Sequence, residues 1–211
     1  MAYIGDHYCA ELNSDDKDDL DLPLFNNRSN GGTLVIWKKS LDKYVSVHPV
    51  TSSSFLPIIY SPPGSPVSVH IGLYLPTSGK DSEFIAEISK LQLLVEELNE
   101  LYPSCVIFLR GDCNVNPKNH HRSIIFDTLT TDLILVKIPI SHATYHHFVG
   151  EGLFDSSIDT IMHSNNANIS ETVDEIICKL ENCHVESHHD VIMSTAILPL
   201  NCPSDSPNDN L

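Results

Sequence analysis

Basic residues are scarce in this chain of 211 residues. It contains 12 Lys and Arg against 28 Asp and Glu, which gives a formal net charge of −16 at pH 7. Sequence-independent binding to nucleic acid depends on Lys and Arg that neutralise phosphates, so this composition argues against a broad nucleic-acid-binding surface. The negative charge is unevenly spread, and ELNSDDKDDLDL, at 11–22, is a dense acidic run that we expect to be solvated.

Long apolar runs and paired cysteine motifs are also lacking. No apolar run approaches the ~20 residues that span a membrane, so we expect no membrane association. The opening MAYIGDHYCAEL has neither a basic segment nor an apolar run, and we therefore predict no signal peptide. The 6 Cys form no CxxC pair, which argues against a zinc ribbon. These observations favour an intracellular protein, either nuclear or cytoplasmic.

Hydrophobic patterning predicts an α/β protein with one prominent helix. An apolar stripe at three- and four-residue spacing predicts a helix over 81–103, and Pro103 marks its end. A weaker helix is predicted over 120–131. Runs rich in Val, Ile, Tyr and Phe, divided by Ser, Pro and Gly, predict strands at 33–38, 44–50, 55–60, 67–75, 105–109, 133–140, 157–163 and 190–198. Strands, then a helix, then further strands fit an α/β sandwich.

The same patterning divides the chain into three parts. Residues 1–30 form an acidic, poorly patterned segment in which we predict neither a strand nor a helix. Residues 31–198 form one folded domain. The tail at 199–211 is rich in Pro, Ser and Asn, and we expect it to be disordered.

Four short stretches place polar or ionisable groups beside predicted strands. They are LYLPTSG with Tyr74, RGDCNVN with Asp112 and Asn114, DSSIDTIM with Asp159, and ESHHDVIM with His188 and His189. Asp112 and Asn114 are two residues apart at a strand end, which suits either a shared ligand or a plain turn. Asp159 faces either the core, where a charge needs a partner such as His, or the solvent. The residues alone leave both choices open.

The order of these motifs resembles that of the endonuclease/exonuclease/phosphatase family. The resemblance rests on Tyr-x-Pro, Gly-Asp-x-Asn, Ser-x-Ile-Asp and Ser-x-His, and it covers about residues 31–198. GGTLVIWKKSL, YLPTSG, RGDCNVN and SHHD look most similar to the endonuclease domain of non-LTR retrotransposons. This resemblance implies a DNase I-like four-layered sandwich, in which two mainly antiparallel sheets pack together and helices lie outside. It also implies metal-dependent hydrolysis of phosphodiester bonds, with DNA as the substrate.

The resemblance assigns a role to each motif residue. Asp112 would act as general base on the attacking water, and Asn114 would hold the scissile phosphate or a metal-bound water. His189 would contact the phosphate, Asp159 would orient His189, and Tyr74 would lie beside the phosphate.

The implied cofactor is one Mg²⁺, or alternatively Mn²⁺. Its implied ligands are Asp112, Asn114 and His188. The predicted substrate contacts are Lys118, Arg122 and Thr144. Lys118 and Arg122 belong to PKNHHR, at 117–122, which suits either a contact to a nucleic-acid backbone or a solvated loop.

Two departures from the family pattern limit the functional prediction. The metal-binding Glu of the family, which precedes the Gly-Gly strand, has no counterpart in residues 1–30, and His188 stands where an Asp is common. We therefore expect an N-terminally truncated or decayed copy that lacks the opening strands and has impaired activity. The alternatives are a catalytically inactive remnant that serves as a binding module, and a phosphomonoesterase on the same scaffold. The sequence leaves the oligomeric state open.

Overall fold

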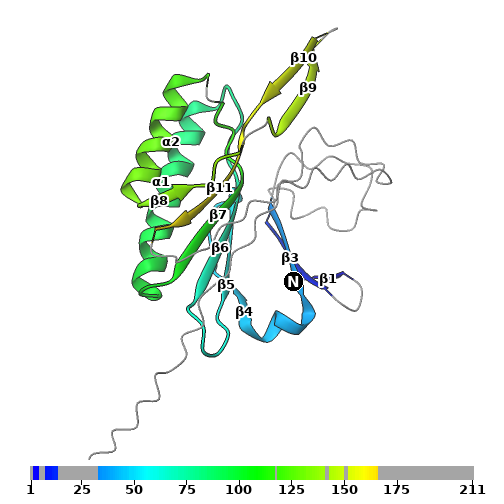
Figure 1. Ribbon diagram of the computed structural model, residues 1–211, viewed down its shortest axis with the longest axis vertical. Coiled ribbons are helices and arrows are strands. Elements are labelled where there is room, and N and C mark those ends of the chain that lie inside the picture. Colours follow the sequence, from blue (N-terminus) through cyan, green and yellow to red (C-terminus); the bar gives the residue numbers. More distant parts are fainter. Residues whose placement is uncertain are drawn as a thin grey trace, which may run out of the picture.

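The structure, a computed structural model, describes residues 2–4, 8–13, 33–116, 118–140, 143–149 and 152–165. These residues form three sheets and two α-helices (Figure 1). The helices and the largest sheet account for most of the buried core. No helix in the described ranges is long and apolar enough to cross a membrane.

The central sheet has six strands in the order β4-β5-β6-β7-β11-β8. Their bounds are β4 Val45–Val47, β5 Phe55–Tyr60, β6 Ser68–Tyr74, β7 Val106–Asp112, β8 Leu135–Lys137 and β11 Asp159–Ser164. All neighbours are antiparallel except β6 and β7, which are parallel. A parallel pair needs a long crossover, and helix α1 (Asp81–Leu101) supplies it.

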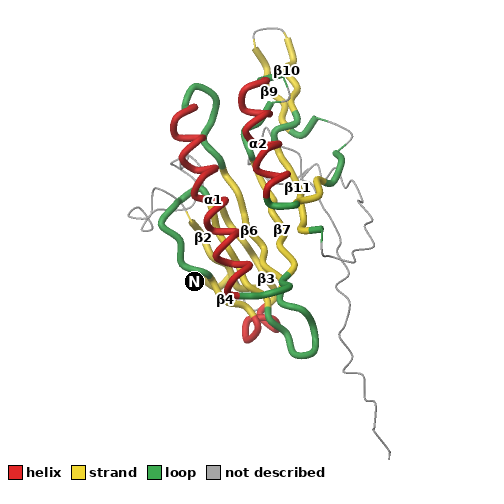
Figure 2. The backbone as a smooth tube through the Cα atoms, turned by 90° about the vertical axis from the view of Figure 1, so that its left-hand side faces the viewer, coloured by secondary structure: helices red, strands yellow, loops and turns green. Residues whose placement is uncertain are grey.

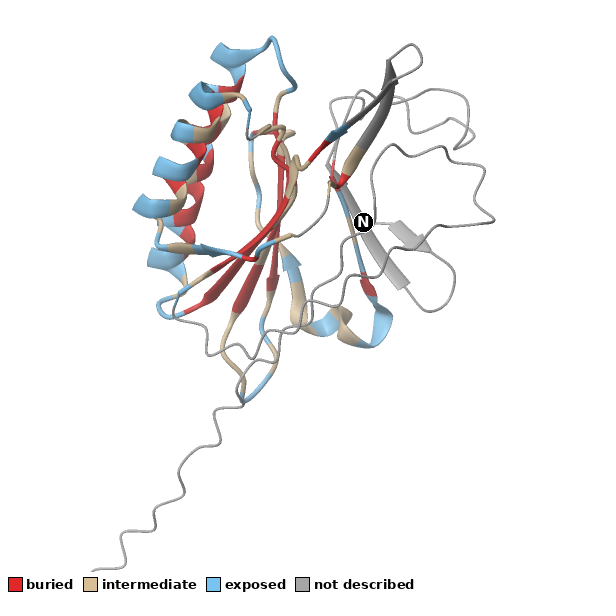
Figure 3. Ribbon diagram, turned by 45° about the horizontal axis from the view of Figure 1, so that its top comes forward, coloured by how far each residue is buried: buried red, intermediate tan, exposed pale blue. Residues whose placement is uncertain are grey.

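Helices α1 and α2 (His120–Asp132) cover one face of this sheet (Figures 1 and 2). The sequence predicts an apolar stripe on α1, and the structure confirms it, since all five stripe residues are buried: Phe84, Ile88, Leu91, Val95 and Leu98. They pack on inward-facing residues of β6, β7 and β11, such as Ile71, Leu109 and Met162. Figure 3 shows this buried layer between the helices and the sheet. The positions of the site residues at the strand ends depend on this core.

The opposite face of the central sheet is partly covered by a second sheet of order β1-β2-β3, with β1 Ala2–Ile4, β2 Tyr8–Asn13 and β3 Thr33–Lys38. Strand β3 approaches so closely that a Cβ on Gly72 would lie 2.1 Å from Cγ2 of Thr33. Trp37 on β3 packs with Leu56 and Ile58 of β5. Helices, central sheet and second sheet are three layers of the predicted sandwich. The alternate side chains Leu34 and Ile36 remain 54% and 50% exposed.

Strands also occur where the sequence pattern predicts none. Strands β1 and β2 lie in the segment at 1–30 and continue from β3 through antiparallel pairing. Strand β9 (Tyr145–Val149) pairs with β10 (Gly152–Ser156) in a hairpin. The sequence pattern predicts no strand at the position of β10. This hairpin projects past the end of the central sheet (Figures 1 and 2). Backbone pairing to a neighbour stabilises these short strands, and hydrophobic patterning does not detect it.

Candidate active site at the ends of β6, β7 and β11

Three of the predicted site residues lie in one row across neighbouring strands. Tyr74 is the register partner of Asp112 in the parallel pair of β6 and β7, and Asp159 is the register partner of Asp112 in the antiparallel pair of β7 and β11. Paired residues project from the same face of a sheet. That face is the one opposite the helices, because the adjacent Leu73 and Cys113 belong to the helix-side core. Segments far apart in sequence therefore place a phenol and two carboxyl groups side by side.

The stretch RGDCNVN forms a turn and part of this row at once. Oδ1 of Asp112 accepts the backbone N–H of Asn114 at 2.8 Å, which is an Asx turn. Asn114 has φ 50°, in the left-handed region that Asn tolerates well. Its Nδ2 donates to the carbonyl oxygen of Leu75 at 2.7 Å, and Leu75 N–H donates to the carbonyl of Asp112 at 2.9 Å. These bonds fasten the ends of β6 and β7 to each other.

Gly111 permits the close approach of these two strands. Its φ of 134° is a backbone conformation that other residues rarely adopt. A Cβ at this position would lie 2.2 Å from the carbonyl oxygen of Leu73 on β6. The Gly before Asp112 is therefore required by the backbone geometry next to the site.

A cavity of about 700 Å³ opens at this end of the sheet. Its lining combines hydroxyl, amide and carboxyl groups with one Lys and two Tyr rings. The lining residues are Tyr74, Thr77, Ser78, Asp112, Asn114, Asn116, Lys118, Asn119, Tyr145, Ser156 and Ile158. Tyr74, Asp112, Asn114 and Lys118 were expected in a site from the sequence, and the structure brings them into one cavity. Lys118 is exposed at its edge.

The other lining residues were not among the predicted site residues, although Ser156 and Ile158 belong to the Ser-x-Ile-Asp motif. Tyr145 and Ser156 belong to β9 and β10, so the hairpin contributes one wall of the cavity. The Thr-aromatic pair at 144–145 is the one signal that points to Tyr145. Asn116 holds the loop after β7, because its Oδ1 accepts the backbone N–H of Lys118 at 2.9 Å.

The electrostatics of the site keep two titratable groups protonated. Burial, and then the nearby Asp112 carboxylate, raise the pKa of Tyr74, although Lys80 acts in the opposite direction. The phenol is thus a hydrogen-bond donor across the neutral range. Burial also raises the pKa of the Cys113 thiol well above its usual range, with further contributions from Asp112 and Asp159. Cys113 is fully inside the protein and neutral, so it is no nucleophile.

Asp159 is the first residue of β11 and is half-buried. Its backbone N–H donates to Oγ1 of Thr144 at 3.3 Å. Thr144 is completely buried, and its own N–H donates to the carbonyl of Ser156 at 3.0 Å. The substrate contact that the sequence predicts for Thr144 remains a prediction, and in the structure the side chain has no exposed surface. Thr144 joins the base of the hairpin to the strand that carries Asp159.

Arg122, another predicted substrate contact, lies inside the protein. Its side chain is only 1% exposed, and it does not line the cavity. Its guanidinium donates to Oδ1 of Asp81 and to three backbone carbonyls. Its donors are thus bonded inside the protein in this structure, and the predicted substrate contact of Arg122 remains a prediction.

His188 and His189 lie outside the described residues, so their predicted roles remain predictions. Among the residues that the structure describes, no group of three or more His, Cys, Asp or Glu could hold a metal ion. Asp112 and Asn114 still supply carboxylate and amide oxygens, and Asp159 adds a carboxylate in the same row. This donor set fits Mg²⁺, which prefers a few oxygen ligands together with water and substrate phosphate.

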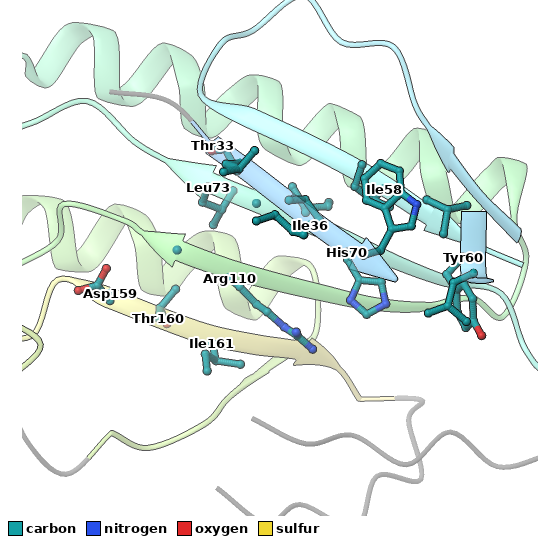
Figure 4. A pocket seen from close by; sticks show the side chains of 18 residues that line it. Thr33, Ile36, Ile58, Tyr60, His70, Leu73, Arg110, Asp159, Thr160 and Ile161 are labelled. Atoms are coloured by element: carbon teal, nitrogen blue, oxygen red, sulfur yellow. The ribbon is translucent and has the colours of Figure 1, made fainter. Parts of the chain in front are cut away.

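A second cavity, of about 740 Å³, lies between β3 and the central sheet (Figure 4). Asp159 lies at one end, with Arg110 and His70 further along. The His70 ring stacks on Phe108, with centroids 4.9 Å apart and planes 9° apart, and the Arg110 guanidinium carbon is 5.0 Å from the Phe108 centroid. Burial, and then the positive charge of Arg110, lower the pKa of His70 to about 4. The imidazole is therefore neutral near pH 7.

Comparison with solved structures identifies the fold. The endonuclease domain of TRAS1, a telomere-specific non-LTR retrotransposon, superposes with a TM-score of 0.60 at 12% identity, covering 89% of this chain and 80% of that chain. The protein has the DNase I-like fold. An endonuclease/exonuclease/phosphatase family protein from Leptotrichia buccalis C-1013-b gives a TM-score of 0.59 at 15% identity, covering 92% and 74% of the two chains.

A third similar structure is the catalytic domain of human Nocturnin with a bound sulfate anion. It gives a TM-score of 0.58 at 12% identity, with 91% of this chain and 73% of that chain covered. No protein-family model matches the sequence, and no curated protein matches it either. The likeness thus lies in the fold, and it confirms the structural class that the four motifs predict.

Proposed function

We propose that this protein hydrolyses phosphodiester bonds in DNA in a metal-dependent reaction of the retroelement endonuclease type. The observation that carries the proposal is the row formed by Tyr74, Asp112 and Asp159, in which Tyr74 and Asp112, together with Asn114, line a cavity of about 700 Å³. Asp159 lies beside Asp112 and lines the neighbouring cavity. A row of this kind supplies a base, a protonated donor and metal-binding oxygens within one site. The DNase I-like fold of the TRAS1 endonuclease domain supports the same assignment.

Asp112 and Asn114 would hold the metal ion, together with Asp159 in the same row. One hydrogen of the Asn114 Nδ2 is engaged by the Leu75 carbonyl. The Oδ1 atom accepts hydrogen bonds and binds cations, so through it Asn114 would hold a cation or a water molecule. When bound, Mg²⁺ or Mn²⁺ supplies stabilisation of the negative charge that develops on the phosphate oxygens.

The remaining groups suit a singly charged diester. The Asp112 carboxylate orients the attacking water and accepts its proton. The Tyr74 phenol, held neutral by its raised pKa, donates a hydrogen bond to a non-bridging phosphate oxygen. Lys118 is the sole cationic side chain among the residues that line this cavity, which fits one phosphodiester better than a cluster of phosphates.

Nicking of supercoiled plasmid by the purified protein tests the proposal. We expect Mg²⁺- or Mn²⁺-dependent nicking that a chelator abolishes and that Asp112→Ala lowers by about two orders of magnitude or more. Asp127→Ala, the same change at an exposed position of α2, is the matched control and should leave the rate unchanged. Equal rates for Asp112→Ala and Asp127→Ala would refute the site.

An inactive binding module is the second candidate, and one observation favours it. The described part of the chain contains no group of three or more His, Cys, Asp or Glu that could hold a metal ion. If so, the folded protein would bind a short DNA duplex equally well with metal and with chelator, and would never nick. Metal-dependent nicking would exclude this candidate.

A further inference from the structure

Arg122 is the largest side chain among the fully buried residues, yet it carries a full positive charge. A charge with no access to water requires several strong partners. Arg122 has four. Its Nε donates to Oδ1 of Asp81 at 2.7 Å, Nη1 donates to the carbonyls of Pro76 at 2.7 Å and Asn114 at 3.3 Å, and Nη2 donates to the carbonyl of Thr77 at 2.8 Å.

These partners belong to the two loops that carry the candidate active site. Pro76 and Thr77 follow Tyr74 at the end of β6, and Asn114 follows Asp112 at the end of β7. One guanidinium on α2 thus binds the backbone of both loops from the side away from the cavity. The centroid of the Phe84 ring on α1 lies 4.5 Å from the guanidinium carbon, within reach of a cation–π interaction.

The bond to Asn114 holds a left-handed backbone conformation. Asn114 has φ 50°, and two further hydrogen bonds depend on that backbone: its N–H to Asp112 and its Nδ2 to Leu75. The direction of its Oδ1 follows from them. A left-handed residue at a functional site persists where its surroundings hold it. Arg122 binds the backbone carbonyl of Asn114. By fixing this backbone, it also fixes the direction in which the side-chain Oδ1 of Asn114 points.

We propose that Arg122 is a positioning residue for the active site: by binding the backbone of both loops it sets the geometry of Asn114 relative to Tyr74 and Asp112. This assignment rests on the proposed function for its catalytic consequence, while its structural part can be measured independently. Arg is required because its planar fork presents donors in several fixed directions. A Lys ammonium at the same place has one nitrogen and cannot reach all four acceptors.

The test compares Arg122→Lys with the wild type and with Asp127→Asn, a conservative exposed control on α2. We expect kcat for nicking to fall by about tenfold or more per folded molecule, because Asn114 and Asp112 contact the reacting groups, while KM for DNA changes little. A variant that is merely less stable, but folded at the assay temperature, would keep kcat. An unchanged kcat, or a loss confined to KM, would overturn the proposal.

A second readout separates this proposal from the proposed function. The side-chain amide protons of Asn114, which donate to Leu75, should exchange with solvent faster by about tenfold in Arg122→Lys than in the wild type. If the wild type never nicks DNA, the proposed function fails, and this exchange rate alone decides the role of Arg122. Unchanged exchange would overturn it.

If Arg122→Lys does not fold, Asp81→Ala takes its place. The Asp81 side chain is 55% exposed, so its loss is tolerated more easily, yet it frees Nε of Arg122. Faster exchange of the Asn114 amide protons in Asp81→Ala supports the proposal, and an unchanged rate overturns it.

Discussion

The partly buried imidazole of His70 makes stability depend on pH in a defined way. His70 lies on β6, stacked on Phe108 and next to Arg110, and its pKa is lowered from the ordinary 6.5 to about 4. In the unfolded chain the same group binds a proton near pH 6.5. Protonation therefore favours the unfolded state as the pH falls.

The size of this effect follows from the two pKa values. Above pH 6.5 the imidazole is neutral in both states, and it costs no stability. Between pH 6.5 and 4 the unfolded state binds the proton and the folded state does not, so the free energy of unfolding declines. Below about pH 4 the full difference is reached, and the gap between about 4 and 6.5 corresponds to about 3 kcal/mol.

The assay is urea unfolding of the wild type, His70→Gln and His121→Gln at several values between pH 7 and pH 4. Gln does not titrate, and its amide can still meet Ser68 Oγ, the present 3.1 Å partner of the His70 ring. We expect the stability of His70→Gln to fall less with acidification, by about 3 kcal/mol over the whole range. The control His121→Gln removes an exposed imidazole of α2 and should follow the wild type. Parallel curves for the wild type and His70→Gln would refute the reasoning.

Three further predictions concern packing and substrate charge. Gly111→Ala should lower the free energy of unfolding by about 3 kcal/mol, because the new Cβ meets the Leu73 carbonyl and the backbone φ of residue 111 is 134°. Chemical denaturation measures this change, and a loss under about 0.5 kcal/mol would contradict the prediction. Leu91→Ala, which empties a fully buried position of α1, should cost about 2–5 kcal/mol in the same assay, whereas exposed Leu93→Ala should cost under about 0.5 kcal/mol. Lys118→Ala should weaken DNA binding and reduce the slope of log affinity against log salt by about 1, measured by fluorescence anisotropy at several salt concentrations; an unchanged slope would remove Lys118 from the substrate contacts.

Local patterns in the sequence were sufficient for the scaffold. The stripe from Phe84 to Leu98 has the helical period, and β5 is a continuous apolar run, so both elements could be predicted with little error. The order of the motifs was sufficient for the DNase I-like fold. Strands β1, β2 and β10 were missed because they are stabilised by pairing to neighbours, which leaves no periodic signal in their own residues.

The sequence predicts the main residues of the candidate site, but not the surroundings of each side chain. The motifs identified Tyr74, Asp112 and Asp159, and the register shows why they meet. Arg122 and Thr144 have residue types that suit a substrate contact, but the sequence cannot show that one is enclosed by four acceptors and that the other lies beneath Asp159. The stretch RGDCNVN suits either a turn or a ligand-binding site. In the structure Asp112 forms the turn with Asn114 and also belongs to the candidate site.

Binding of Mn²⁺ followed by NMR tests the central claim most directly. Paramagnetic Mn²⁺ broadens the signals of nearby amides, and we predict that Tyr74, Asp112, Asn114 and Asp159 are broadened together, before the rest of the described residues. Asp112→Ala should abolish this pattern, whereas Asp127→Ala should retain it. Broadening that spares these four amides, or that survives intact in Asp112→Ala, would contradict the account.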